Sequence, residues 1–132
     1  MPILPDLKVI SAEIQPLNFP IPSGLIKKLV FRVGNIGRAP SSAGDPGVYV
    51  NEINPNPPPR ENTIRGQKSY PLSSLIPGGS QLYTQYFFPF LLSRKGIKHF
   101  EIIVNPKSVP GHPGYGQIEE SDYSNNTQIV NL

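Results

Sequence analysis

The chain has 132 residues, which suits one domain over residues 1–132 with a single core. It contains no cysteine, so disulfides, thiolate metal sites and a cysteine nucleophile are excluded. Its net charge of +3 comes from Lys and Arg residues spread along the chain, with only Lys27-Lys28 and Arg94-Lys95 adjacent, so we expect no nucleic-acid partner, because phosphate binding needs clustered cations.

Short apolar runs separated by turn-forming residues predict an all-β chain with seven strands and no helix. The 17 Pro and 12 Gly residues fall between these runs, and their share stays below the roughly 25–30% typical of disordered chains. In chain order the predicted strands are Leu7–Ile14, Leu25–Gly34, Gly47–Ile53, Thr63–Tyr70, Gln81–Phe88, Ile97–Asn105 and Asn126–Leu132.

Alternation within the strands predicts which side chains enter the core. In the clearest strand we expect Leu29, Phe31 and Val33 to be buried. The first strand alternates weakly, as an edge strand allows, with Leu7, Val9 and Ser11 on one face. The remaining inward positions that we expect are Val48, Val50, Phe100, Ile102 and Val104.

The fifth predicted strand has aromatic residues on both faces, so burial alone does not choose between them. We expect its even-numbered face, with Leu82, Thr84, Tyr86 and Phe88, in the core. The apolar run Tyr86 to Leu92, interrupted by Pro89, is too short to cross a membrane. We interpret Leu91 to Gly96 as a basic connection.

The start of the chain, Met1 to Leu7, lacks the basic and apolar regions of a signal peptide. Either the protein is cytosolic or the chain is part of a longer exported protein. Strands of this spacing, joined by turns, are typical of an antiparallel β-sandwich.

An acidic and amide-rich stretch, Gln117 to Thr127, precedes the last strand and is predicted to be an ordered loop, because Asn, Asp and Ser side chains bond nearby backbone groups. The loops after the second strand and before the last strand meet at one end of such a sandwich. Residues expected to converge there are Asn35, Asn105, Glu119, Glu120, Asp122, Asn125 and Asn126.

Two interpretations of this loop stay open. Oxygen-bearing side chains are the ligands that calcium prefers, and Asn105, Glu119, Glu120 and Asp122 are the candidate ligands. We favour the alternative, in which these side chains bond backbone groups and fix the loops, because their spacing matches no known calcium loop.

With the strands placed, the chain resembles CARDB, the cell-adhesion-related domain found in bacteria and archaea. The motifs that carry the resemblance are, in order, Pro5-Asp6-Leu7, Val33-Gly34-Asn35-Ile36-Gly37, Leu75 to Gly78, Val104-Asn105-Pro106, Ile118 to Asp122 and Asn125-Asn126-Thr127. The chain departs from the family pattern at Gly34, Asn105 and Lys98, and its loop from Lys107 to Gln117 is longer than usual.

The resemblance implies an immunoglobulin-like or fibronectin-III-like sandwich without catalytic residues or cofactor. It implies a spacer or adhesion module of a prokaryotic cell-surface or secreted protein, with adjacent domains of the same polypeptide as partners and a monomer when isolated. The alternative function is a carbohydrate- or protein-binding module that uses the long loops at one end, assisted by calcium. We expect no membrane insertion.

Three further features of the sequence are candidates for sites or contacts. His99 and His112 match neither a catalytic motif nor metal-ligand spacing. Asn125-Asn126-Thr127 fits the pattern of a glycosylation acceptor. Tyr49, Ile103 and Val130 would form an apolar strip on the outer face of one sheet if the third, sixth and seventh strands pair, but we favour the alternative that a long loop covers them or that they are scattered singly.

Overall fold

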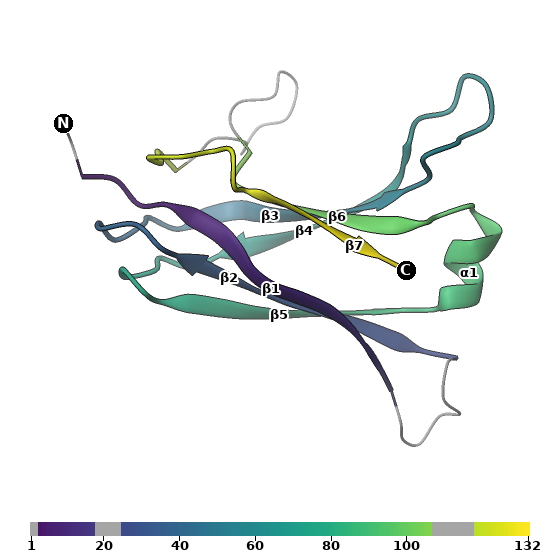
Figure 1. The fold of residues 1–132 in the computed structure, drawn as a ribbon, viewed down its shortest axis with the longest axis horizontal. Helices are drawn as coiled ribbons and strands as arrows, with labels where there is room; N and C mark the ends of the chain where they lie inside the picture. The colour runs from purple at the N-terminus through teal and green to yellow at the C-terminus, as the bar shows by residue number, and fades with distance from the viewer. Residues whose placement is uncertain (1–2, 18–24, 107–117) are drawn as a thin grey trace.

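The computed structural model describes residues 3–17, 25–106 and 118–132. Within these residues the chain forms seven strands and one short helix (Figure 1). The elements are β1 (Leu7–Pro16), β2 (Lys27–Asn35), β3 (Gly44–Ile53), β4 (Ile64–Leu72), β5 (Ser80–Phe87), α1 (Pro89–Arg94), β6 (His99–Val104) and β7 (Thr127–Asn131).

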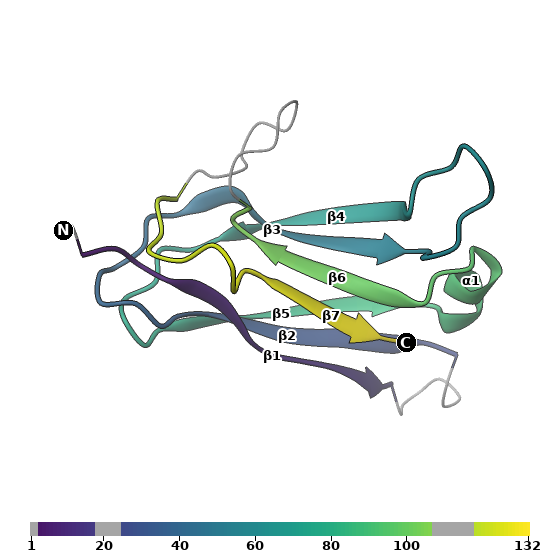
Figure 2. The ribbon, with the colours of Figure 1, turned by 45° about the horizontal axis from the view of Figure 1, so that its top comes forward.

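The strands form two antiparallel sheets that pack face to face (Figures 1 and 2). One sheet has the order β1-β2-β5 and the other the order β4-β3-β6-β7. The chain therefore changes sheet after β2 and returns to pair β5 with β2, which is a Greek-key connection. The all-β, seven-stranded, immunoglobulin-like sandwich predicted from the sequence is confirmed.

Residues that alternate on the inner faces of both sheets form the core. Leu29, Phe31 and Val33 of β2 are fully buried, as predicted. Across the interface, Phe100, Ile102 and Val104 of β6 are also fully buried, and Val48 and Val50 of β3 join the same cluster. Aromatic rings connect the sheets, since Phe87 of β5 packs edge-on against Phe100 with ring centroids 5.1 Å apart.

The prediction for the fifth strand is wrong. The odd-numbered face of β5 enters the core, with Tyr83 and Phe87 buried, whereas Leu82, Tyr86 and Phe88 are exposed. Tyr83 fits the core because its ring stacks on Phe31 with a centroid distance of 4.9 Å and its hydroxyl donates to the Pro71 carbonyl at 2.7 Å. A tyrosine whose hydroxyl finds a partner buries its ring at little polar cost.

Two further expectations need correction. The segment Leu91 to Gly96, interpreted as a basic connection, contains most of the six-residue helix α1. The helix starts with Pro89 at its first position, where proline is tolerated because that N–H is unpaired in any helix. In β1, the alternation shifts at a bulge between Val9 and Ser11, so Ala12 and Ile14 pack against the core and Ser11 is exposed.

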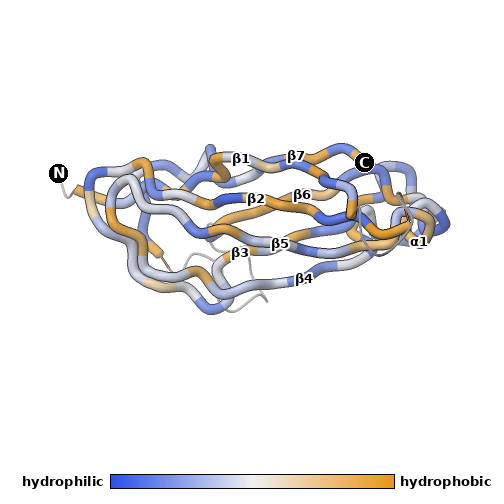
Figure 3. Tube along the Cα trace, turned by 90° about the horizontal axis from the view of Figure 1, so that it is seen from below, coloured by the Kyte–Doolittle hydropathy of each residue, from blue (hydrophilic) through white to orange (hydrophobic). Residues whose placement is uncertain are grey.

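Seven antiparallel crossings place the two ends of the described chain at opposite ends of the long axis (Figure 1). We call the end that bears residues 3–6, 36–43, 73–79 and 118–126 the loop end. The other end, which bears α1, residues 54–63 and Leu132, is the helix end. In Figure 3, β1 and β7 lie at the same side of the sandwich, whereas β4 extends past β5 at the other side.

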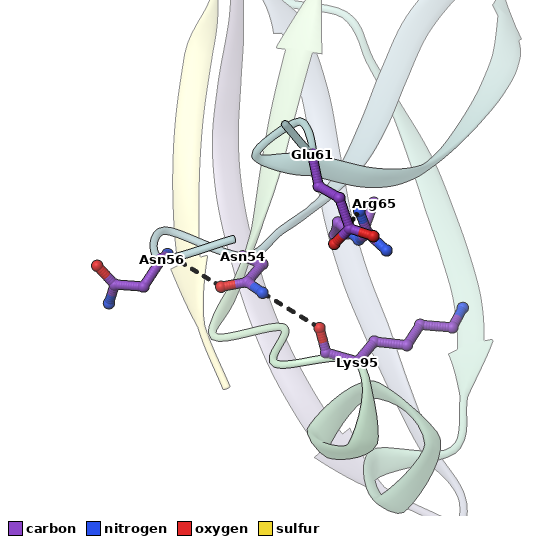
Figure 4. Close-up of polar contacts among 5 residues, drawn as sticks. All are labelled: Asn54, Asn56, Glu61, Arg65 and Lys95. Carbon is purple, nitrogen blue, oxygen red and sulfur yellow. Dashed lines mark hydrogen bonds and ion pairs between the residues drawn. The ribbon is translucent and has the colours of Figure 1, made fainter. Parts of the chain in front are cut away.

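Asn54 holds the helix end together (Figure 4). Its side-chain amide donates to the Lys95 carbonyl at 3.3 Å, and its side-chain oxygen accepts from the Asn56 N–H at 2.9 Å. Glu61 and Arg65 form an exposed ion pair at 3.1 Å where the loop returns to β4. The β3–β4 loop is thereby attached to the residue that ends α1.

Candidate functional site at the loop end

The carboxylate of Glu120 is the centre of a buried polar network. Its side chain is 5% exposed, although it lies in the loop before β7. Oε1 accepts from the backbone N–H of Leu7 at 2.6 Å, and Oε2 accepts from the side-chain amides of Asn105 at 2.7 Å and Asn126 at 2.5 Å. A buried carboxylate is tolerated when several donors surround it. Glu120 therefore links the start of β1, the end of β6 and the start of β7.

Asn105, the first residue after β6, helps to position this network and lies in the left-handed region, with φ of +43°. Asparagine adopts this conformation more readily than most residues. Its side chain bonds the returning loop twice, since Oδ1 accepts from the Ile118 N–H at 3.1 Å and Nδ2 donates to the Ile118 carbonyl at 2.6 Å. The chain is thus held on both sides of the segment that the structure does not describe.

A second buried amide, Asn35, fixes the other loops of this end. Its oxygen accepts from the backbone N–H groups of Asp6 at 3.1 Å and Gly37 at 3.0 Å. Its nitrogen donates to the carbonyls of Ala39 at 2.8 Å and Leu75 at 3.0 Å. All four hydrogen-bonding positions of the side chain are used, which explains why an amide is buried at this place.

Asp6 connects the two networks. Its backbone N–H binds Asn35, and its carboxylate Oδ1 accepts from the Asn125 side chain at 2.9 Å. The neighbouring Pro5 carbonyl accepts from the Ser121 N–H at 2.9 Å. Residues 5–7 therefore run between the loop after β2 and the loop before β7 and bond both.

The environment of Glu120 changes its proton affinity. Burial raises the pKa of Glu120 above its ordinary value of 4.5, and the charge of Asp6 acts in the same direction, while the hydrogen bonds from Asn105, Leu7 and Asn126 oppose the rise. Two residues further on, hydrogen bonds from Ser124 lower the pKa of the fully exposed Asp122. One loop thus contains two carboxylates with opposite shifts.

The structure brings together only part of the predicted calcium set. Asn105 and Glu120 are bonded to each other, but Glu119 is exposed and Asp122 uses its Oδ1 for the N–H and hydroxyl of Ser124. Among the described residues, no group of three or more His, Asp or Glu side chains is placed to hold a metal ion. The arrangement is that of backbone-bonding side chains.

Two oxygens of this end have no partner among the described residues. Oδ1 of Asn125 and Oδ1 of Asn126 are both buried and accept no hydrogen bond there. Asn126 nevertheless uses its nitrogen twice, for Glu120 and for the Val104 carbonyl at 2.7 Å, so the side-chain orientation is fixed. A buried oxygen of this kind usually binds water or a cation.

The weaker hypotheses fare differently. Tyr49 lies opposite Ile103 as expected, but it is only 5% exposed, and Val130 packs against the core, so the three residues form no exposed strip. The Asn125 amide, the nitrogen that a glycan would modify, is engaged by Asp6. His99 is half-buried at the start of β6. His112 and Gln117 lie outside the described residues.

A cavity of about 230 Å³ lies at the helix end, whereas Glu120 belongs to the loop before β7 at the loop end. The cavity lining mixes apolar and polar residues and contains no Asp, Glu or His side chain; it consists of Ile14, Lys27, Phe87, Pro89, Ser93, Ile97, Lys98 and Leu132. In the described part of the chain, no helix has the length and apolar character that crossing a membrane requires.

Sequence reasoning missed three contributors to the site. Asp6, the Leu7 N–H and Tyr123 were assigned no role, yet the Tyr123 hydroxyl donates to the Ile118 carbonyl at 2.9 Å and accepts from the Glu120 N–H at 3.2 Å. A backbone N–H carries no sequence signal. The acid in Pro5-Asp6 at the start of a strand was the only available hint.

Comparison with known proteins leaves the family open. No family model matches the chain, and no curated protein matches it. Among solved structures, β-glucosidase 3B from Thermotoga neapolitana in complex with α-D-glucose is similar at 12% identity and a TM-score of 0.42, over 96% of this chain and 16% of that one. The glucose complex of the same enzyme gives 12% identity and a TM-score of 0.40, over 97% and 17%. The chain thus spans less than a fifth of these proteins.

Proposed function

We propose that this chain is a non-catalytic module of a cell-surface or secreted protein and acts as a rigid spacer or adhesion domain. The observation that carries the proposal is the position of the chain ends on opposite ends of the long axis (Figure 1). An odd number of antiparallel crossings produces this arrangement. Domains joined in series through such a module are separated by its full length.

The use of the polar residues at the loop end supports the same proposal. A binding or catalytic site needs side chains whose polar atoms face a ligand. Here the buried residues Asn35, Asn105 and Glu120 direct most of their hydrogen bonds to backbone groups or to one another. They stabilise the loops against deformation, which suits a spacer.

Assignment to the CARDB family is part of the proposal. Its support is that the motif residues bond one another: Asn35 of the second motif accepts from Asp6 of the first, and Glu120 of the penultimate motif accepts from Asn126 of the last. Motifs far apart in sequence thereby act as one structural unit.

Small-angle X-ray scattering on one copy and on two copies fused in series tests the spacer role. We expect the maximum dimension to increase by nearly the full length of one module, because the second copy continues along the axis. A fused pair that folds back to a compact particle would contradict the proposal.

A calcium-assisted binding module is the second candidate function, favoured by the unpartnered oxygens of Asn125 and Asn126. An NMR titration with calcium, and then with soluble glycans, separates the two candidates. Amide shifts confined to residues 35–45 and 118–126 support the binding module, with Glu120→Gln as the variant that should abolish them. Unchanged spectra support the spacer.

A further inference from the structure

The two sheets differ by one strand, and the difference falls at one side of the sandwich. Three strands face four. At one side β1 and β7 are in contact, and the Leu7 N–H of β1 binds Glu120 just before β7. At the other side β4 extends past β5 (Figure 3). The position beside β5 and above β4 therefore has no strand among the described residues.

Burial along β3 and β4 shows the consequence. Val50 of β3 lies directly opposite Lys68 of β4, so both side chains are on the inner face of the sheet. Val50 is 1% exposed, whereas Lys68 is exposed. One step along, Val48 is fully buried and its partner Tyr70 is half-buried. The inner face of β4 is thus only partly covered.

The edge of β5 lacks the features that usually prevent strand pairing. Edge strands are commonly protected by charges, prolines or bulges. Ser80–Phe87 contains no charged residue and no proline, and its register with β2 is continuous. By contrast, β1 has a bulge and ends in Pro16, and β4 contains Lys68 and Pro71.

The outward backbone groups of β5 can be identified from the ladder. Antiparallel partners alternate between residues that exchange hydrogen bonds and residues that do not. The Asn35 N–H donates to the Gly79 carbonyl at 3.0 Å, so the odd-numbered residues of β5 direct their backbone groups to β2. Leu82, Thr84 and Tyr86 therefore direct theirs away from β2, toward the position that no described strand occupies.

We infer that the edge of β5 binds an extended segment of another polypeptide, which adds to the sheet as a fourth strand and places an acidic side chain on Lys68. Main-chain hydrogen bonds to Leu82, Thr84 and Tyr86 supply the affinity, as in other proteins that bind peptides by strand addition. The side chains that point inward from the added strand cover Tyr70 and Lys68.

Charge selects the acidic side chain. Lys68 forms no ion pair within the described residues, whereas Glu52, its diagonal neighbour on β3, is 3.9 Å from the Lys95 Nζ. A strand that covered Lys68 with apolar groups would bury an unpaired ammonium, which is unfavourable. A carboxylate at that place compensates the charge.

A synthetic peptide as long as β5 serves as the probe, with the sequence Thr-Val-Thr-Glu-Thr-Val-Thr-Val and blocked ends. Titrated into the ¹⁵N-labelled chain, it should shift the amides of Leu82, Thr84 and Tyr86 most. A peptide with Gln in place of Glu should bind about two- to fivefold more weakly, the range of a partly exposed ion pair. In Lys68→Gln the two peptides should bind equally.

Two further arms make the test decisive. A peptide methylated on alternate backbone nitrogens should not bind to the chain. The Thr84→Pro variant of the chain should not bind the original peptide, since the substitution removes an outward N–H without breaking the β2 ladder. Thr84→Val, which keeps the N–H, is the matched control. The inference is wrong if shifts occur only at the loop end, if no peptide binds, or if Glu and Gln peptides bind the original chain equally. A dimer in sedimentation experiments that Thr84→Pro abolishes would assign the edge to a second copy instead.

Discussion

The side-chain amide of Asn105 donates to Oε2 of Glu120 at 2.7 Å, joining the first residue after β6 to a loop residue 15 positions later. This bond joins the start of the long connection between β6 and β7 to a residue near the end of that connection. It also explains why an acidic loop is ordered, because each Glu120 oxygen receives a donor from a different part of the fold.

Replacing Glu120 by Ala should destabilise the fold by about 2–4 kcal/mol, because the buried Leu7 N–H and two buried amides lose their acceptor. Urea unfolding followed by circular dichroism measures the change. Glu119→Ala, at the exposed neighbouring position, is the control and should stay within about 0.5 kcal/mol. Equal effects of the two substitutions would show that Glu120 stabilises nothing.

The pKa values of the two carboxyl groups of the loop should be shifted in opposite directions. Burial raises the pKa of Glu120 above 4.5, so its contribution to the free energy of unfolding is complete below pH 4.5 and is lost as pH rises through the raised pKa. Hydrogen bonds from Ser124 lower the pKa of Asp122 below 3.8, so its contribution is present above pH 3.8 and is lost as pH falls through the lowered pKa.

Carbon-13 NMR of the side-chain carboxyls measures both values directly. The Glu120→Gln side chain does not titrate, so this variant isolates the contribution of Glu120. The free energies of unfolding of the variant and of the original chain are compared between pH 3 and pH 7, a span of about four units around the ordinary pKa of a glutamate. An ordinary midpoint for Glu120 would disprove the effect of burial.

Gly37→Ala should cost about 2–3 kcal/mol, because its Cβ would lie 2.5 Å from the Asp6 nitrogen and 2.8 Å from the Leu4 carbonyl oxygen, both backbone atoms. Gly34→Ala is the contrast. Its Cβ would meet Cδ1 and Cγ1 of Ile10, whose side chain is 50% exposed and not backbone, so we expect a smaller cost than at Gly37, about 1 kcal/mol. Thermal unfolding of both variants checks the order.

Gly96→Ala should destabilise the helix end for two reasons. The residue has φ of +75°, and its Cβ would lie 2.7 Å from the Asn54 Nδ2, so we expect a cost of about 2–3 kcal/mol. In an Asn54→Ala background the contact disappears and only the backbone cost of about 1–2 kcal/mol should remain. Strict additivity in this double-mutant cycle would refute the contact between Gly96 and Asn54.

Tyr83→Phe should cost about 1 kcal/mol, since the partly buried hydrogen bond from the Tyr83 hydroxyl to the Pro71 carbonyl, 2.7 Å long, is lost. Tyr86→Phe, on the exposed face of the same strand, should have no measurable effect. Chemical denaturation of the two variants tests which face of β5 is inside. A larger effect at Tyr86 would reverse the assignment.

The sequence by itself determined the fold class and most of the core. Period-two alternation in β2 and β6 is unambiguous, because one face is apolar and the other carries charged or polar residues, and both predictions are confirmed. The same reasoning failed in β5. Both of its faces are aromatic, so only the packing of Tyr83 against Phe31 decided which one is buried.

The loop end shows the same division. Side-chain chemistry predicted that Asn35, Asn105 and Glu120 would fix loops at one end of the sandwich, and the structure places all three there in buried positions. It did not predict that residues 5–7 join the two networks, because the acceptor of a backbone N–H depends on which segments the fold brings together. The offset between the sheets, and with it the open edge of β5, is also a property of the tertiary structure, since strand number per sheet follows from how the faces pack and not from any local pattern.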